Sequence, residues 1–294
     1  MVDRLVFEDR AYILQRKEDA GGRGVNASCV LESFGVETTA ILAAGGETGA
    51  KMAGYLNQRA FRSEIVPIAA ESRTNLAVSD KQGLTIKLDE LGPPMTPAEL
   101  KKVRAAVEKF IPKASWLMIC GSVPPGVSPH FYCELIELAA RRNVKTLLDT
   151  DGDALLHGVE AGPTVVTPNQ QEAERLLNRA LITRSQFLEA VERIHAMGAK
   201  SVLLSLGSRG AIATNGEHMY EALPPRVDAL CPIGAGDALA AAFVWASIGQ
   251  KPFQEAIRWA VAAGTASAVL PGMNMESLEQ TRAMYKSVEV RPAK

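Results

Sequence analysis

The chain has 294 residues, 47% of them hydrophobic, which is enough to bury the core of a large α/β body with a smaller appendage. Its formal net charge of −1 at pH 7 argues against nucleic acid or a membrane surface as the main partner. The longest apolar stretch, 259–270, is too short and too rich in small residues to span a bilayer. The four cysteines form no Cys-x-x-Cys pair, so we expect reduced thiols and a cytoplasmic protein.

Two segments near the N-terminus, residues 1–16 and 62–91, alternate apolar and polar side chains without a convincing helical pattern. Within the second, residues 74–79 and 84–88 flank a short turn and predict a β-hairpin. We expect the two segments to form a small antiparallel sheet that projects from the body as a lid. The body then comprises residues 17–61 and 92–294.

The rest of the chain alternates short apolar β-type runs with amphipathic helical runs. This rhythm predicts a parallel sheet with helices on both faces, and ligand-binding residues at the carboxyl ends of its strands. The predicted strands are 116–120, 145–149, 164–167 and 201–205, and the predicted helices are 27–34, 130–142, 171–177, 186–197 and 238–248.

The turn formed by Gly234, Ala235 and Gly236, followed by Asp237, is the most informative motif. Small residues let backbone N–H groups surround an anion, and the start of the following helix adds partial positive charge. A carboxylate there suits a base that takes a proton from an attacking hydroxyl while the N–H groups hold the transferring phosphoryl. Taken alone, the motif fits equally well a glycine-rich turn with an acid near a helix start.

Two further motifs have a structural and a functional interpretation. The glycine-rich turn 21–26 permits close approach of a ligand, but it also suits a tight connection between lid and body. Asn169 and Glu172 offer oxygen ligands suited to Mg²⁺, but the same spacing is typical of a helix capping box. For both motifs alone, the structural interpretation is favoured.

Three arginines, Arg10, Arg23 and Arg73, lie in or beside the predicted lid. Converging guanidinium groups would suit a phosphorylated substrate, because each can bind a phosphate through two hydrogen bonds. The alternative is that all three are solvated surface residues.

Taken in order, four motifs resemble those of the ribokinase-like (PfkB) carbohydrate kinases. They are residues 21–26, 168–172, 205–210 and 234–237. The resemblance covers nearly the whole chain and implies a three-layer α/β sandwich with a mostly parallel central sheet and a small β-sheet lid. Within the family the chain is most similar to the hexose-phosphate kinases (1-phosphofructokinase, minor 6-phosphofructokinase and tagatose-6-phosphate kinase), through residues 72–76, 120–126, 205–207 and 224–225.

This resemblance implies a role for each motif. Asp237 is the base that deprotonates the sugar hydroxyl. The backbone N–H groups of Gly234, Ala235, Gly236 and Asp237 form the anion hole for the γ-phosphoryl. Asn169 and Glu172 orient Mg²⁺ and its waters. The ATP site is lined by Ser205, Gly207, Gly210 and Gly236.

The substrate is implied in the same way to be a small sugar phosphate. Gly21, Gly22 and Asn26 contact the sugar, while Arg73 and Arg10 bind its phosphate. The lid closes over the sugar, excludes water as a competing acceptor, and pairs with a second lid in a homodimer.

The chain departs from the family pattern at its start. Matching Asn26 and Arg73 to the family places the first central strand before residue 1, so that strand is expected to be missing. We expect a misassigned start codon to explain this. Thr167 also stands where related phosphofructokinases carry lysine, which weakens the subfamily assignment more than the family assignment.

The sequence therefore predicts an ATP- and Mg²⁺-dependent kinase for a ketohexose phosphate of the fructose-1-phosphate, fructose-6-phosphate or tagatose-6-phosphate type. One alternative is a kinase for an unphosphorylated sugar or a nucleoside. A second is a protein that binds a nucleotide or sugar phosphate without turnover.

Overall fold

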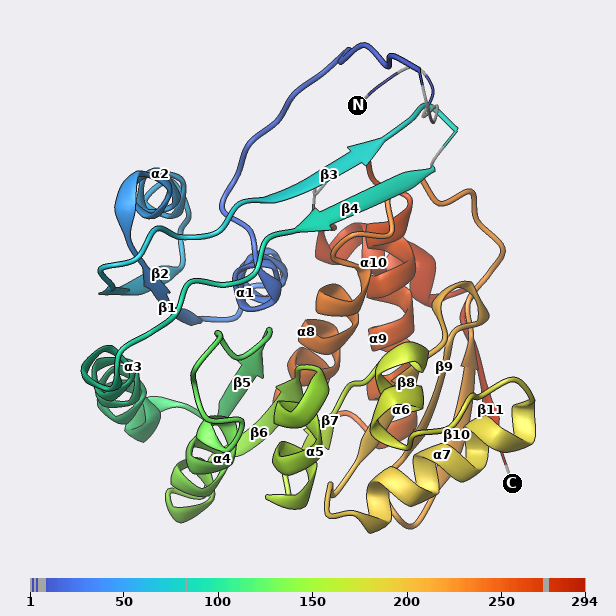
Figure 1. Ribbon diagram of the computed structural model, residues 1–294. Helices are drawn as coiled ribbons and strands as arrows, with labels where there is room; N and C mark the ends of the chain where they lie inside the picture. The colour runs from blue at the N-terminus through green and yellow to red at the C-terminus, as the bar shows by residue number, and fades with distance from the viewer. Residues whose placement is uncertain (1, 3, 5–8, 83, 272–274, 294) are drawn as a thin grey trace.

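The computed structural model describes residues 2, 4, 9–82, 84–271 and 275–293, and its middle layer is a seven-stranded sheet (Figure 1). In spatial order the strands are β11 (Glu289–Pro292), β10 (Met219–Leu223), β9 (Ala211–Thr214), β8 (Val202–Ser205), β7 (Val165–Val166), β6 (Lys145–Asp149) and β5 (Trp116–Cys120). Neighbours are parallel from β5 to β8 and antiparallel from β8 to β11.

This sheet confirms the four predicted strands and is mixed, with three parallel and three antiparallel strand pairs. The apolar runs of β6 and β7 are buried on both faces, as expected for strands covered by two helix layers. The antiparallel half was not predicted, because β9 to β11 are short and β9 follows β8 after only a tight turn at 206–210.

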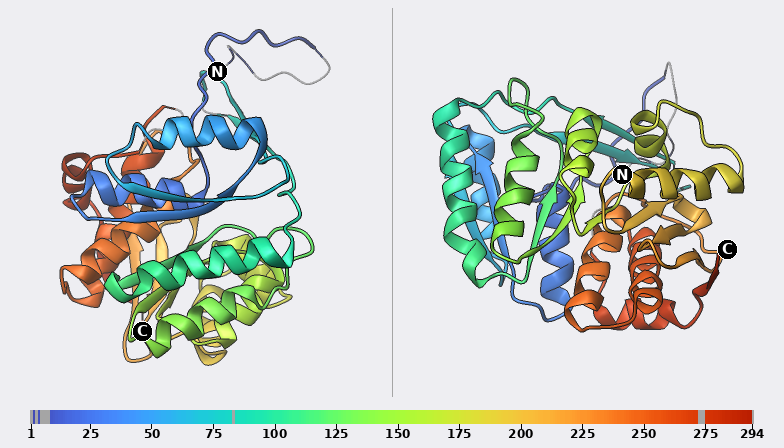
Figure 2. Two further views of the ribbon diagram at one scale, coloured as in Figure 1. Left: turned by 90° about the vertical axis from the view of Figure 1, so that its left-hand side faces the viewer. Right: turned by 90° about the horizontal axis from the view of Figure 1, so that it is seen from below.

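Helices cover both faces of the sheet (Figure 2). One face carries α4 (Phe131–Arg141), α5 (Gly152–Glu160), α6 (Gln170–Leu176) and α7 (Arg184–Ala196), and α3 (Pro97–Phe110) extends this helix layer beside α4; their buried side chains contribute to the larger core cluster. The other carries α1 (Arg23–Ser33), α8 (Ala235–Ile248), α9 (Phe253–Ala268) and α10 (Leu278–Tyr285). Among the described helices, none is long and apolar enough to cross a membrane.

Helix α8 is apolar on all sides, which its position explains. It packs against α1, α9 and the sheet, so its residues 238–244 are all buried. Its N-terminus therefore lies at a fixed place at the carboxyl edge of the sheet.

Two more strands form a separate parallel pair beside the main sheet. They are β1 (Thr39–Ala44) and β2 (Arg62–Pro67), with α2 (Gly46–Leu56) between them in the chain. Strands β1 and β5 are both edge strands of their sheets, yet α1 packs on both. Among the described residues no strand joins β1 to β5 in the middle layer, in agreement with the prediction that one central strand is missing.

The lid is a two-stranded hairpin that spans the carboxyl edge of the sheet (Figure 1). It consists of β3 (Asn75–Ser79) and β4 (Thr85–Asp89), so the predicted hairpin is confirmed. Val2 bridges to Ile13 and Asp80, which joins the N-terminal segment to the hairpin, while residues 1, 3 and 5–8 of the predicted lid lie outside the described residues.

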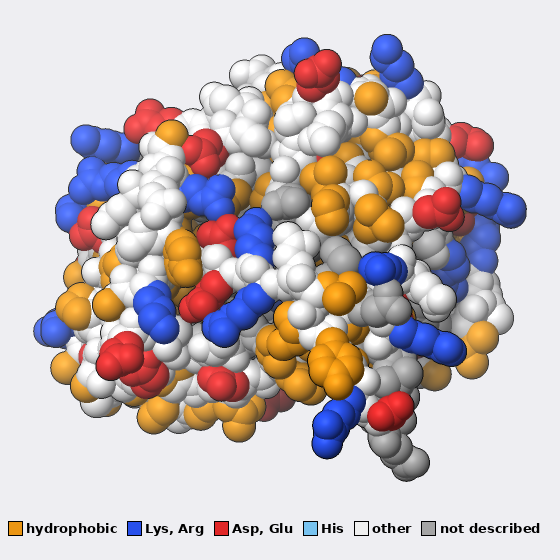
Figure 3. Space-filling view, turned by 90° about the horizontal axis from the view of Figure 1, so that it is seen from above, with side chains coloured by type: hydrophobic (Ala, Val, Ile, Leu, Met, Phe, Trp, Pro, Cys, Tyr) orange, Lys and Arg blue, Asp and Glu red, His pale blue; other side chains and the backbone are white. Residues whose placement is uncertain are grey.

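One part of the predicted lid was assigned wrongly. Residues 62–67 form β2 and pair in parallel with β1, because their apolar side chains pack beneath α3. The lid proper therefore begins after β2. Viewed from the lid side, hydrophobic side chains lie open to solvent among charged ones (Figure 3).

Candidate active site

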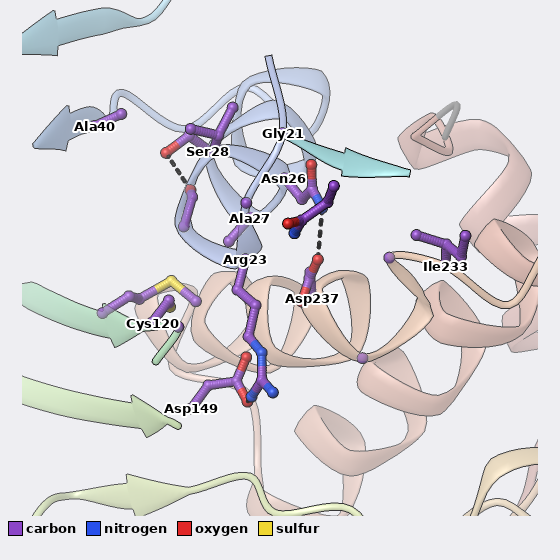
Figure 4. Close-up of a pocket in the computed structure, with 18 of the residues that line it drawn as sticks. Gly21, Arg23, Asn26, Ala27, Ser28, Ala40, Cys120, Asp149, Ile233 and Asp237 are labelled. Atoms are coloured by element: carbon purple, nitrogen blue, oxygen red, sulfur yellow. Dashed lines mark hydrogen bonds and ion pairs between the residues drawn. The ribbon is translucent and has the colours of Figure 1, made fainter. Parts of the chain in front are cut away.

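A single connected cavity of about 2890 Å³ lies between the lid and the carboxyl edge of the sheet. Its walls come from the turn before α1, the ends of β5, β6 and β8, the start of α8 and the inner side of the hairpin. These segments are distant in sequence and meet only in the folded chain. Figure 4 shows the part of the cavity around Asp237 and Arg23.

The glycine-rich turn before α8 presents backbone N–H groups to this cavity. Gly234 caps the helix with φ of 85°, a left-handed conformation that favours glycine. The N–H of Ala235 donates to Pro232 O at 3.3 Å, whereas no described residue accepts from the N–H groups of Gly236 and Asp237. Two donors at a helix start are thus available for an anion.

Asp237 stands in the first turn of α8 and faces α1. Its Oδ2 accepts a hydrogen bond of 2.7 Å from Nδ2 of Asn26, which is 6% exposed (Figure 4). Burial raises the pKa of Asp237 to about 6, although Asn26, Arg23 and Lys87 each act to lower it. The carboxylate is therefore ionised at neutral pH and close enough to its pKa to accept a proton readily.

Arg23 occupies the centre of an acidic cluster next to Asp237. Its Nη1 donates to Asp149 Oδ1 and its Nη2 to Glu172 Oε1, both at 2.9 Å, and Asp151 Oδ2 lies 3.6 Å from Nη2. Burial works to lower the pKa of Arg23, but Asp149 and Glu172 raise it on balance, so the guanidinium stays charged. Burial also raises the pKa of Asp149 to about 7, against the opposing effect of Arg23.

Asn169 and Glu172 form a reciprocal capping box at the start of α6. Asn169 Oδ1 accepts from the Glu172 N–H at 2.9 Å, and Glu172 Oε2 accepts from the Asn169 N–H at 2.8 Å. Because Arg23 takes Glu172 Oε1, protein donors already engage both oxygens of that carboxylate. Among the described residues no group of three His, Cys, Asp or Glu side chains is arranged to hold a metal ion.

The turn after β8 borders the other end of the cavity. Ser205, Gly207 and Gly210 all line it. A Cβ on Gly210 would lie 1.9 Å from Ala222 O, so this glycine is required by close packing. Gly207, with φ of 61°, has no heavy atom within 4 Å of such a Cβ and leaves open space for a ligand.

The structure separates the three arginines. Arg73 lines the cavity, and its guanidinium donates weakly to Glu90 O and Ser122 Oγ, each at 3.4 Å. Arg10 is exposed on the N-terminal segment and is not among the residues that line the cavity, so the structure gives no support to its predicted role in binding the substrate's phosphate. Arg23 points into the acidic cluster rather than toward Arg73.

The first glycine-rich turn lies where the sequence placed it. Gly21 and Gly22 line the cavity, and Gly22 caps α1 with φ of 120° while its carbonyl accepts from the Asn26 N–H. Glycine is favoured at position 22 by this positive φ rather than by close packing, because no heavy atom lies within 4 Å of a Cβ built there. The cavity next to Gly22 is therefore open.

Sequence reasoning missed Asp149 and Lys87 and misplaced Arg23. Asp149 ends a predicted strand at the ligand-binding edge, a signal that could have identified it. Lys87 stands on the hairpin, lines the cavity and lowers the pKa of Asp237. No sequence signal distinguishes Lys87 from other lid lysines, because only the strand register turns it inward.

Comparison with known proteins gives consistent matches over nearly the whole chain. A model of the pfkB family of carbohydrate kinases matches residues 1–279. The ATP-dependent 6-phosphofructokinase isozyme 2 of Escherichia coli is 30% identical over 275 residues, 91% of this chain and 87% of that protein. The 1-phosphofructokinase of Rhodobacter capsulatus is 30% identical over 277 residues, 93% of this chain and 87% of that protein.

A solved structure shows the same arrangement in space. The crystal structure of phosphofructokinase-2 from Escherichia coli in complex with fructose-6-phosphate matches with a TM-score of 0.87 at 27% identity. The match covers 97% of this chain and 93% of that one.

Proposed function

The chain belongs to the pfkB family of carbohydrate kinases, and we propose that it transfers the terminal phosphoryl group of ATP to a free hydroxyl of a ketohexose phosphate. The observation that carries the chemistry is the pairing of the half-buried, ionised Asp237 with two N–H donors that no described residue engages, at the same helix start. The carboxylate of Asp237 can remove a proton, and the two N–H groups can stabilise negative charge on a phosphate. All three groups lie within one turn of α8.

The reaction can be followed through this chain's own atoms. Asn26 engages Oδ2 of Asp237, which leaves Oδ1 to accept the proton of the attacking hydroxyl. The hydroxyl oxygen bonds to the γ-phosphorus as the bond to the β,γ-bridging oxygen breaks, and ADP leaves with that electron pair. The N–H groups of Gly236 and Asp237 hold the equatorial oxygens, and Asp237 later releases its proton to solvent.

Magnesium fits this site through water rather than through direct ligation. Asn169 and Glu172 carry the oxygen donors that suit a hard cation, but hydrogen bonds already engage these oxygens. We assign them to hold ordered water around the nucleotide's Mg²⁺, which would neutralise phosphate charge. Ser205, Gly207, Gly210 and Gly236 are assigned to the nucleotide site. The four cysteines are free thiols, which supports a reducing compartment such as the cytoplasm.

A panel assay tests the proposed function. ADP release is measured with fructose 1-phosphate, fructose 6-phosphate, tagatose 6-phosphate and unphosphorylated fructose. At least one phosphosugar is expected to exceed fructose in kcat/KM by about 100-fold, because charge-assisted contacts to phosphate are worth several kcal/mol together. Equal rates with fructose, or no ADP release with any phosphosugar, would contradict the proposal.

Arg73 is assigned to the phosphate already on the substrate. The change Arg73→Ala is expected to raise KM for the sugar phosphate by about 10- to 100-fold, with a smaller effect on kcat. Arg10→Ala is the matched control, because Arg10 is also a lid-region arginine but lies outside the cavity. An unchanged KM in the Arg73 variant, or equal effects in both, would remove Arg73 from the substrate site.

We also assign the outer face of the lid to a homodimer contact. Leu88 is 58% exposed and is not among the residues that line the cavity, whereas Lys87 on the opposite face of β4 lines it. Strand β4 thus has a ligand-facing side and an apolar side chain that meets solvent in the single chain. Tyr12 and Ile13, 75% and 73% exposed, add to the apolar surface of the lid region.

Sedimentation measurements can test this contact. Leu88→Lys is expected to weaken self-association by about tenfold or more, because it places a charge in an apolar interface. Ile182→Lys is the matched control, since Ile182 is 76% exposed but lies before α7, away from the lid. A monomeric unmodified chain, or a dimer insensitive to the Leu88 change, would overturn the assignment.

A further inference from the structure

The turn after β5 is held from two sides at its first residue. Gly121 has φ of 92°, a left-handed conformation that favours glycine. Its N–H donates to Asp149 O, at the end of β6, at 2.8 Å. Its carbonyl accepts a hydrogen bond of 3.1 Å from the hydroxyl of Tyr132, the second residue of α4. Both backbone polar groups of Gly121 are therefore engaged, one by the neighbouring strand and the other by a helix.

Tyr132 lines the cavity, although it belongs to the helix layer. Burial raises the pKa of Tyr132, and Cys120 acts in the same direction. The phenol therefore stays protonated at neutral pH and remains a hydrogen-bond donor. Its electrostatic interactions with Arg23 and Asp149 place it beside the acidic cluster. The proposed transfer of the phosphoryl group makes no use of this hydroxyl.

Ser122, the next residue of the turn, contacts Arg73. Its Oγ accepts from Arg73 Nη1 at 3.4 Å, and the same Nη1 donates to Glu90 O at 3.4 Å. Arg73 precedes β3 and Glu90 follows β4, so this contact lies where the chain enters and leaves the lid. The position of Ser122 therefore affects where the guanidinium of Arg73 stands in the cavity.

The same turn also lies against the chain that leaves the lid. A Cβ built on Gly92 would lie 3.8 Å from Pro124 Cα and from Pro125 Cδ, which is ordinary van der Waals contact. The N–H of Thr74 donates to Glu90 Oε2 at 2.8 Å, which joins the two ends of the hairpin to each other. The turn after β5 thus supports both ends of the lid.

We propose that Tyr132 is a positioning residue: its hydroxyl fixes the turn after β5 and thereby holds Ser122 and Arg73 where they bind the substrate's phosphate. Packing does not fix the turn at Gly121, because no heavy atom of the described residues lies within 4 Å of a Cβ built there. The hydrogen bonds to its two backbone groups must do so instead. This inference rests on the proposed function, in which Arg73 binds that phosphate.

Tyr132→Phe keeps the ring and removes the donor. KM for the sugar phosphate is expected to rise about five- to tenfold, while kcat and KM for ATP stay within about twofold. Tyr285→Phe is the matched control, because the Tyr285 hydroxyl donates to Glu255 Oε2 and Tyr285 is not among the residues that line the cavity. An unchanged KM in the Tyr132 variant, a comparable loss of kcat, or an equal rise of KM in the control would overturn the proposal.

A double-mutant cycle tests the route through Arg73. In an Arg73→Ala background, Tyr132→Phe is expected to raise KM for the sugar phosphate by less than about twofold, because the guanidinium that it positions is already gone. A full five- to tenfold rise in that background would show that Tyr132 acts by another route and would overturn the assignment.

Hydrogen exchange tests the positioning without turnover. In Tyr132→Phe the amides of residues 121–123 are expected to exchange about fivefold faster, while those of β7 are unchanged. Unchanged exchange at residues 121–123 would overturn the positioning role even in an active kinase. Faster exchange there in a chain that phosphorylates no sugar phosphate would support the anchoring of the turn and contradict the proposed function alone.

Discussion

Asp237→Asn is expected to lower kcat by about 10²- to 10⁴-fold while leaving nucleotide affinity nearly unchanged. The amide has almost the shape of the carboxylate and can still accept the hydrogen bond from Asn26, but it cannot take the hydroxyl proton. Steady-state kinetics and calorimetric titration with nucleotide measure the two quantities separately.

The control for lost charge is Asp228→Asn. Asp228 lines the same cavity but is exposed and lies outside the turn before α8. Its variant is expected to keep kcat within a few-fold of the unmodified value. Comparable losses in both variants would show that negative charge in the cavity matters, rather than proton transfer at Asp237.

The pH dependence adds a second measurement at the same residue. Burial raises the pKa of Asp237 to about 6, so kcat/KM is expected to fall about tenfold per pH unit below 6 and to be level above it. This acidic limb should be absent in the residual activity of Asp237→Asn.

Stability should respond to pH in the opposite direction. The pKa of Asp237 is higher in the folded chain than in the unfolded chain, where it is about 3.9. The carboxyl group therefore favours folding most at pH values below about 4, and this contribution is lost as the pH rises through about 6. At pH 8, Asp237→Asn is expected to melt at a higher temperature than the unmodified chain.

The main layers of the fold could be predicted from the sequence because their signals are local. The apolar runs of β5 and β6 and the helical periodicity of α4 and α7 identify each element without its neighbours. The short antiparallel strands β9 to β11 could not be identified in this way. They are stabilised by pairing with distant parts of the chain, and β11 joins β10 only after α8, α9 and α10 have intervened.

The site was predictable where one short motif contains both the reactive side chain and the backbone N–H groups beside it, as in residues Gly234 to Asp237. The site was not predictable where a side chain on one helix or strand makes its contacts with residues of other elements that are distant in sequence. Arg23 starts α1 but reaches Asp149 at the end of β6 and Glu172 in α6, 126 and 149 positions away. Nothing in the residues around Arg23 reveals those partners, so the sequence placed it with the phosphate-binding arginines.

Arg23→Met is expected to lower both stability and catalysis, and it is the most informative test of the acidic cluster. Arg23 is 30% exposed at its side chain, while its partners Asp149 and Glu172 are 10% and 3% exposed. Without the guanidinium these carboxylates lose their cation, at a cost of about 1–3 kcal/mol in the free energy of unfolding. Urea denaturation measures this loss, and Arg23→Lys is expected to recover part of it.

A matched control separates the cluster from ion pairs in general. Arg59 is 35% exposed and pairs at 3.1 Å with Asp19, which is 21% exposed and lies outside the cluster around Arg23. Arg59→Met is expected to cost less than about 1 kcal/mol, because Lys17 also lies 3.6 Å from Asp19 and this carboxylate is better solvated than Glu172. Equal losses in the two methionine variants would contradict a special role for the cluster.

The pH profile then distinguishes positioning from mere structural support. Arg23 lowers the pKa values of both Asp149 and Asp237, so its removal should move the acidic limb of kcat/KM to higher pH. Protonation of Asp149 would in turn limit the loss of stability, since a neutral carboxyl needs no cation. A variant that is less stable but keeps the acidic limb near pH 6 would show that Arg23 only braces α1 against β6 and α6. A shifted limb, restored by lysine, would show that the guanidinium keeps the base ionised at the pH where the hydroxyl must give up its proton.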